Sequence, residues 1–261
     1  MSAAALPAPF RAFSYHWLLY RRTWRGSIVI GLVNPLLFLT GIGIGIGKLI
    51  DANSGGVDGV SYLAWLAPGV LAASAMQMAF AGGGFSVFRD ASPQGSYPSA
   101  SATPLSPTDI LVGHQLFTTL RVGLLSAGFV AVQIALGAAP SIWGAALAVP
   151  AACLTGLAFS APMAAWAVTV RRFTTLQTVF RFVVQPLYLL SGTFFPLTTT
   201  PSWLQKLAYA SPLWHGVELC RGLSLGTLTA RALLLHGGIL VALTVAGLAC
   251  ARVTYRRRLH E

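Results

Sequence analysis

Apolar and polar positions alternate along this chain on the scale of whole helices. Long apolar runs are separated by short polar segments, and each run reaches the roughly 20 residues that a helix needs to cross a bilayer core of about 30 Å. We count six such runs, at 27–49, 62–85, 110–137, 142–170, 176–195 and 230–251. Several runs contain proline, which a helix bundle tolerates because neighbouring helices satisfy the freed carbonyl groups. The sequence therefore predicts an all-α membrane protein, a single domain over residues 1–261 with six transmembrane helices.

An aromatic stripe precedes the first run. Phe13, Trp17 and Trp24 belong to it, at helical spacings within residues 8–25, and arginines such as Arg21 lie beside them. Aromatic rings next to guanidinium groups are typical of a helix that lies in the headgroup region. We expect an amphipathic interfacial helix over residues 8–25, with a simple basic flank of the first span as the alternative.

Two connections are too long to be simple turns. Residues 87–107 end in Ser106 and Pro107, followed by Asp109, which is the pattern of an N-cap, a first-turn proline and a capping-box acid. Residues 196–229 are amphipathic but are interrupted by proline at two positions. This favours two short outer helices, re-entrant or interfacial, over a seventh span.

Composition and charge agree with the membrane interpretation and give an orientation. The chain is 55% hydrophobic and only 9% charged, whereas a soluble domain carries about a quarter charged residues. The net charge of +11 could indicate nucleic acid, but the basic residues gather at the ends of the apolar runs, at Arg11, Arg21, Arg22, Arg25, Arg171, Arg172, Arg252, Arg256, Arg257 and Arg258. This is the positive-inside pattern, so we expect both termini in the cytoplasm and no nucleic-acid partner.

The arginine content is a second indication. Fifteen arginines against two lysines are typical of a GC-rich bacterial genome, which favours the bacterial cytoplasmic membrane.

A glycine ladder from Gly41 to Gly47, followed by Lys48, looks like a phosphate-binding loop. The P-loop spacing fails, because Ile42 stands where a glycine is required and Leu49 where serine or threonine is required. Gly41 and Gly45 instead form a small-xxx-small face for close helix packing. We expect no ATP site and no catalytic residue in this chain.

Arg121 is a charge inside the third apolar run. Such a charge is costly in a bilayer, so we expect it either to pair within the bundle or to serve a substrate pathway or gate. No relay of acids or histidines crosses the spans, which counts against a proton-driven carrier.

Two other chemistries are weaker alternatives. An intramembrane serine protease would use Ser191 as nucleophile and His236 as base, but Leu189 stands where that family has glycine. His215 and Glu218, three residues apart, are a weak metal pair. We expect Glu218 instead to pair with His215 or Arg221 at the surface, and we expect no metal site.

Several motifs, in order along nearly the whole chain, carry a family resemblance. They are Pro68-Gly69, Tyr97, the segment 102–110 (ATPLSPTDI), the segment 190–197 (LSGTFFPL), the segment 201–204 (PSWL) and the segment 211–215 (SPLWH). The chain thereby resembles the permease subunits of ABC-2-type transporters, particularly the nodulation-factor exporter permeases and their drug-resistance relatives.

The resemblance implies a transport permease, with export and import both open. An amphipathic substrate such as a lipid, glycolipid or hydrophobic drug suits a pathway lined by Phe, Trp, Leu and Gly with almost no charge. The permease would work beside a second permease copy or a sister permease, with two separate cytoplasmic ATPase subunits that hold ATP and Mg, so that this chain has no cofactor of its own. The resemblance also implies a coupling helix over residues 96–103, with Ser96, Tyr97, Ala100 and Thr103 facing the ATPase, and a pathway or gate that includes Phe194 and Phe195 besides Arg121. The rival class is a secondary carrier or a non-catalytic membrane scaffold.

Overall fold

The protein is an all-helical bundle. The computed structural model describes residues 7–259, apart from the side chains of residues 27, 28, 30, 32 and 34. Within this range there is no β-strand, only one isolated bridge between Val57 and Val60. The predicted all-α class is therefore confirmed.

Three of the long helical stretches contain a π-helical segment (η2, η3 and η4). In chain order the elements are α1 (Ala8–Phe38), η2 (Leu39–Ile46), α2 (Gly47–Ser54), α3 (Tyr62–Phe80), η3 (Ala81–Ser86), α4 (Val87–Asp90), α5 (Ser96–Ser101), α6 (Pro107–Ala135), α7 (Ile142–Ala167), α8 (Phe173–Val179), η4 (Phe180–Val184), α9 (Gln185–Leu190), the 3-10 turn η5 (Leu197–Thr199), α10 (Ser202–Tyr209), α11 (Pro212–Leu225) and α12 (Ala230–Leu259).

Five helices among the described residues are long and apolar enough to cross a membrane. They are Pro35–Ser54, Tyr62–Asp90, Pro107–Ala135, Ile142–Ala167 and Ala230–Leu259. The predicted run at 176–195 forms the continuous stretch α8–η4–α9, which is helical but is not among the five. This stretch contains the polar residues Gln177, Arg181 and Gln185, which lower its mean hydropathy. It is therefore not counted among the helices that are apolar enough to span a membrane.

Helix α3 is the centre of the bundle. In its spanning window 78% of the residues are buried, against 22% for the windows in Pro35–Ser54 and in α12. It packs against α6, α7 and α11. A helix that is apolar on all sides is suited to such a position, because no face of it has to meet a polar surface.

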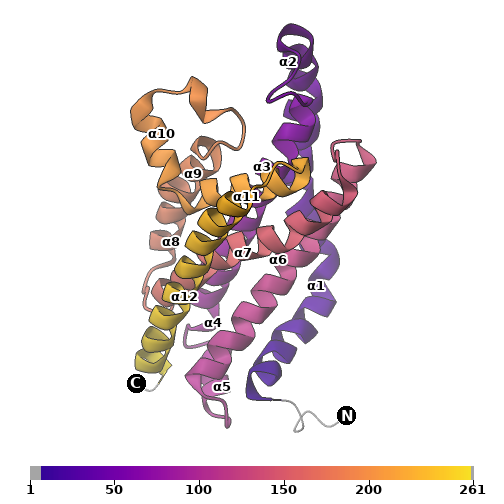
Figure 1. The fold of residues 1–261 in the computed structure, drawn as a ribbon. Coiled ribbons are helices and arrows are strands. Elements are labelled where there is room, and N and C mark those ends of the chain that lie inside the picture. The colour runs from indigo at the N-terminus through magenta and orange to yellow at the C-terminus, as the bar shows by residue number, and fades with distance from the viewer. Residues whose placement is uncertain (1–6, 260–261) are drawn as a thin grey trace.

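The N-terminal segment differs from the expectation. The interfacial helix expected over residues 8–25 is not separated from the first span, because the helix runs without a break from Ala8 to Ser54. It packs along α6, and the two helices are side by side in Figure 1. The contact needs glycine at Gly113, where an added Cβ would lie only 2.7 Å from the Pro9 carbonyl oxygen.

The two ends of the bundle are different. Helix α1 begins and α12 ends at the same end, which we call the termini end, and α4 and α5 lie there too (Figure 1). Helices α2 and α10 lie at the opposite end, which we call the far end. The termini end has its own hydrophobic cluster, in which Tyr97, Ile110, Leu176 and Tyr255 are buried together.

Candidate functional site

Helix α5 is a short helix on the connection between two long ones. Gly95 precedes it, where an added Cβ would collide with the Asp90 carbonyl oxygen, so only glycine fits there. Pro98 lies in its first turn, where proline is tolerated because those N–H groups have no intrahelical partner. The next helix begins at the predicted capping box, in which Ser106 Oγ accepts from the Asp109 N–H at 3.2 Å and Asp109 Oδ2 accepts from the Ser106 N–H at 2.9 Å.

Tyr97 joins α5 to the rest of the termini end. Its side chain is 1% exposed, and its hydroxyl lies 2.9 Å from His114 Nδ1 on α6 and 3.2 Å from the Tyr255 hydroxyl on α12. His114 Nε2 lies 3.0 Å from the Gly82 carbonyl. Because Nε2 must donate to that carbonyl, Nδ1 accepts from Tyr97, and Tyr97 in turn accepts from Tyr255. Burial raises the pKa of Tyr97 well above its ordinary value, so the hydroxyl keeps its proton.

The four residues predicted to face an ATPase line one cavity of about 480 Å³ beside α1, but they differ in exposure. Tyr97 is buried, Ser96 and Ala100 are half-buried, and Thr103 is exposed. The helix ends at Ser101, two residues before the predicted limit. The exposed positions of α5 are instead Pro98, Ser99 and Ser101. Sequence reasoning found Tyr97 but not its partners His114 and Tyr255, since no motif links them.

Arg121 lines a cavity of about 570 Å³ between α1, η3 and α6. The carbon of its guanidinium group lies 5.9 Å from the ring centres of Tyr20 and Phe117, a cation–π distance. One guanidinium nitrogen lies 3.4 Å from Met78 Sδ. His16, Asp90 and His114 line the same cavity.

The predicted interfacial residues lie along α1 beside this cavity. Phe13 packs edge-on against Phe117, with ring centres 6.3 Å apart, and Trp17 packs against Tyr20 at 6.1 Å. Both are half-buried, whereas Arg21 and Trp24 are exposed. Of these four residues, Phe13 therefore packs against α6, whereas Arg21 and Trp24 face outward.

Phe194 and Phe195 lie elsewhere. Phe194 belongs to an aromatic group with Tyr188 and Phe38, at ring-centre distances of 5.3 and 5.7 Å, and its carbonyl accepts from the Tyr62 hydroxyl at 2.7 Å. Phe195 is half-buried. The structure thus does not bring these two residues to the Arg121 cavity.

Arg221 is a buried cation on α11. Its guanidinium carbon lies 3.8 Å from the ring centre of Trp65, and it donates to the carbonyls of Trp65 and Gly192 at 3.2 and 2.8 Å. It also pairs with Glu218 at 2.9 Å. The predicted Glu218–Arg221 pair is confirmed, but its expected surface position is wrong for Arg221, which is 8% exposed.

The residues considered for a serine protease and for a metal pair form hydrogen bonds and ion pairs with other side chains. His215 Nδ1 lies 2.8 Å from His236 Nδ1, so Glu218 pairs with Arg221 and not with His215. Ser191 Oγ bonds to Ser211 Oγ at 3.1 Å, which leaves the proposed nucleophile away from the proposed base. These contacts do not assemble a serine–histidine pair.

Comparison with known proteins identifies the family. Residues 10–225 match the family model described as ABC-2 type transporter. The chain is 32% identical to Nodulation protein J of Rhizobium leguminosarum bv. viciae, over 99% of both chains, and 30% identical to Nodulation protein J of Rhizobium meliloti strain 1021, over 98% of this chain and 97% of the relative. It is also 25% identical to the inner membrane transport permease YadH of Escherichia coli K12, over 93% and 97% of the two chains. Together with the apolar spanning helices, these matches show that the chain belongs to the ABC-2 type transporter family and is a multi-pass transport permease.

Proposed function

We propose that this chain is the membrane subunit of an ATP-driven exporter and that a separate ATPase docks at the termini end. The observation that carries this proposal is α5, whose exposed positions face away from the bundle while Tyr97 is bonded to α6 and α12. A force on α5 is thereby passed to two long helices. The failed P-loop spacing at Ile42 and Leu49 supports placing ATP and Mg on that partner. In this proposal the complex holds two copies of the ATPase, and the bias comes from the preference of ATP for one conformation.

The proposed substrate is amphipathic, such as a lipid, a glycolipid or a hydrophobic drug. The cavity beside Arg121 is lined by the cations Arg89 and Arg121 and by the rings of Tyr20 and Phe117, so it suits a polar group attached to an apolar body. In this proposal the substrate enters there and leaves past Phe194 and Phe195. An intramembrane arginine is a functional candidate by default.

The proposed topology has six crossings, with both termini in the cytoplasm of a bacterium and the protein in its cytoplasmic membrane. The sixth crossing is the stretch α8–η4–α9. Its support is that α1 begins and α12 ends at the same end of the bundle (Figure 1), as an even number of crossings requires. The basic cluster Arg256, Arg257 and Arg258 lies at the end of α12, which favours this end as the inner one. Helices α10 and α11 then lie at the outer interface.

The proposed assembly is a dimer of permeases that meet along the glycine ladder. An added Cβ at Gly43 or Gly47 would contact Leu63 or Tyr62 within this chain, whereas Gly41 and Gly45 have nothing within 4 Å. The ladder therefore has one occupied face and one open face. Close backbone approach at such small-xxx-small faces drives helix association in lipid.

We expect Gly45→Leu to weaken the dimer by about tenfold, corresponding to about 1.4 kcal/mol. The monomer fold should stay intact, because an added Cβ at this position meets nothing within 4 Å. The measurement is permease self-association in detergent, together with ATP-dependent substrate movement in vesicles. Lys48→Ala, in the same segment, is the control and should be nearly silent. If Gly45→Leu left self-association and transport unchanged while Lys48→Ala abolished transport, the packing role would be rejected and a ligand role for this segment would be open again.

We expect Tyr97→Phe to lower the ATP hydrolysis that the assembled complex shows with substrate by about tenfold, within the usual range of coupling free energies. The variant keeps the ring in the cluster but removes the hydroxyl that bonds to His114 and Tyr255. The assay compares complexes reconstituted in lipid, with Tyr209→Phe on α10 as the matched control at the far end. Equal ATP hydrolysis in the Tyr97→Phe and wild-type complexes would show that α5 does not take part in coupling. The exporter function itself would be rejected if the permease did not co-purify with any P-loop ATPase.

A further inference from the structure

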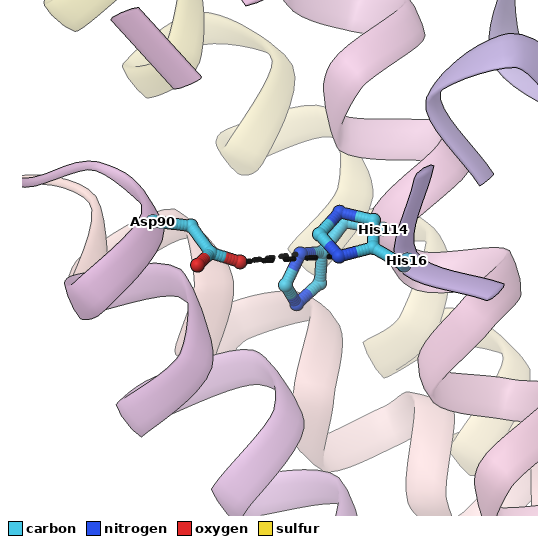
Figure 2. Close-up of side chains that lie close together, drawn as sticks. All are labelled: His16, Asp90 and His114. Carbon is cyan, nitrogen blue, oxygen red and sulfur yellow. Dashed lines mark ion pairs between the residues drawn. The ribbon is translucent and has the colours of Figure 1, made fainter. Parts of the chain in front are cut away.

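Three buried side chains from distant parts of the chain converge beside the Arg121 cavity. His16 lies on α1, Asp90 at the end of α4 and His114 on α6, and Figure 2 shows both imidazoles next to the Asp90 carboxylate. They are 7%, 6% and 2% exposed. Asp90 Oδ2 lies 3.8 Å from His114 Nδ1 and 4.0 Å from His16 Nδ1, and one donor atom of each residue lies within 4.8 Å of the others.

Among the described residues, the carboxylate oxygen in the middle of this group has no hydrogen-bond partner. Asp90 Oδ1 accepts from Arg89 Nε at 3.2 Å, but Oδ2 is buried and receives no donor from the described residues. The distances to the two imidazoles exceed the limit of about 3.2 Å for an N–H···O bond. A buried acceptor left in this way is costly, and a cation between the three groups would remove the cost.

The donor set specifies the kind of cation. Two imidazole nitrogens and one carboxylate oxygen are ligands of Zn²⁺ and neighbouring divalent transition metals, whereas Mg²⁺ and Ca²⁺ take oxygen ligands. Imidazole binds a metal in its neutral form.

The surroundings of His114 also fit a ligand. Its Nε2 donates to the Gly82 carbonyl at 3.0 Å, which fixes the tautomer and leaves Nδ1, 3.8 Å from Asp90 Oδ2, as the nitrogen with a lone pair. This is the outer hydrogen bond that metal-binding histidines commonly make. The nearest cation is Arg89, which donates to Asp90 Oδ1 at 3.2 Å and leaves Oδ2 to an ion; its side chain is 68% exposed.

We propose that His16, Asp90 and His114 bind one divalent transition-metal ion of the Zn²⁺ type, which fastens α1 to α4 and α6. The ion takes the Nδ1 lone pair that now accepts from Tyr97 at 2.9 Å, so Tyr97 keeps only its bond to Tyr255. Metal occupancy thereby changes how α5 is held. The site itself does not depend on the exporter function.

The test is zinc binding by the full-length permease, purified in detergent through a tag without histidines and stripped with a chelator. The protein is titrated with ZnCl₂ against a fluorescent competing chelator, and bound zinc is counted by plasma mass spectrometry. We expect one tight site per chain and an affinity loss of at least about tenfold, the lower bound seen when even outer-shell partners are removed, in each of His16→Gln, Asp90→Asn and His114→Gln. The matched control is His215→Gln, which removes one ring of the other buried histidine pair and should bind zinc as the wild type does.

A second variant keeps the test decisive where a substitution disturbs folding. His16→Cys replaces one ligand by another, so it should still bind zinc and should bind Cd²⁺ more tightly than the wild type does, because thiolate prefers soft metals. Three results would overturn the proposal: less than about a tenth of a zinc ion per wild-type chain under saturating ZnCl₂, loss of zinc in His215→Gln but not in His16→Gln, or no gain in Cd²⁺ affinity in a folded His16→Cys.

Discussion

Gly83→Ala is expected to lower the melting temperature of the permease by about 5 °C, corresponding to a net loss of about 2 kcal/mol. An added Cβ at this position would lie 2.5 Å from the Ser160 carbonyl oxygen and 2.8 Å from the Ser160 Cα. Both are backbone atoms of α7, so no side-chain rotation relieves the overlap. Overpacking of this kind costs up to about 3 kcal/mol, and the higher helix propensity of alanine offsets about 1 kcal/mol of it.

The neighbouring residue supplies the control. An added Cβ at Gly84 would meet Met163 Cγ at 3.2 Å and Sδ at 3.7 Å, atoms of a flexible side chain that can move. Gly84→Ala should therefore melt at or above the wild-type temperature. The measurement is thermal unfolding of the detergent-solubilised protein by tryptophan fluorescence. Equal melting of the two variants would show that η3 and α7 are not packed backbone to backbone.

Arg221→Met is expected to destabilise the fold by about 3 kcal/mol and to reduce the amount of protein recovered from membranes severalfold. The substitution removes a donor from the buried carbonyls of Trp65 and Gly192, and an acceptor left without its partner costs about 1–3 kcal/mol. It also removes the cation from the face of Trp65. Three segments, α3, the loop after α9 and α11, lose a common contact at once.

Two further variants separate this explanation from a simple charge effect. Glu218→Gln should cost much less, because the Glu218 side chain is 37% exposed and glutamine keeps an oxygen that can accept from Arg221. Arg231→Met removes an exposed arginine at the start of α12 and should be neutral. If Arg231→Met or Glu218→Gln were as damaging as Arg221→Met, the hydrogen bonds to the carbonyls would not be the cause.

Much of the helical framework could be predicted from the sequence. In a bilayer every backbone polar group must bond within its own helix, so apolar runs translate directly into spanning helices, and five of the six predicted runs meet that description. The residues at helix starts also predict where two of the helices begin. The capping box at Ser106 starts α6, and Pro212 lies at the start of α11.

The contacts between distant segments could not be predicted. Tyr97 and Tyr255 are 158 positions apart and meet only because α12 returns to the termini end. His16, Asp90 and His114 have no ligand spacing in the sequence, because each comes from a different helix. Arg221 was misjudged because a cation on a short amphipathic helix is usually exposed, whereas α11 packs against both α3 and α7.

The π-helical segment η3 has a consequence for the motion of α4. A π-helical turn holds one residue more than an α-helical turn, so a helix that contains one can change register by a single residue without unfolding. In an α-helix one residue corresponds to a rotation of about 100°. Since η3 lies between α3 and α4, such a slip would turn Asp90 away from His16 and His114 while the central helix α3 stayed in place. Because η3 lies inside the spanning helix Tyr62–Asp90, a one-residue slip there would couple the rotation of α4 to the geometry of the His16–Asp90–His114 group.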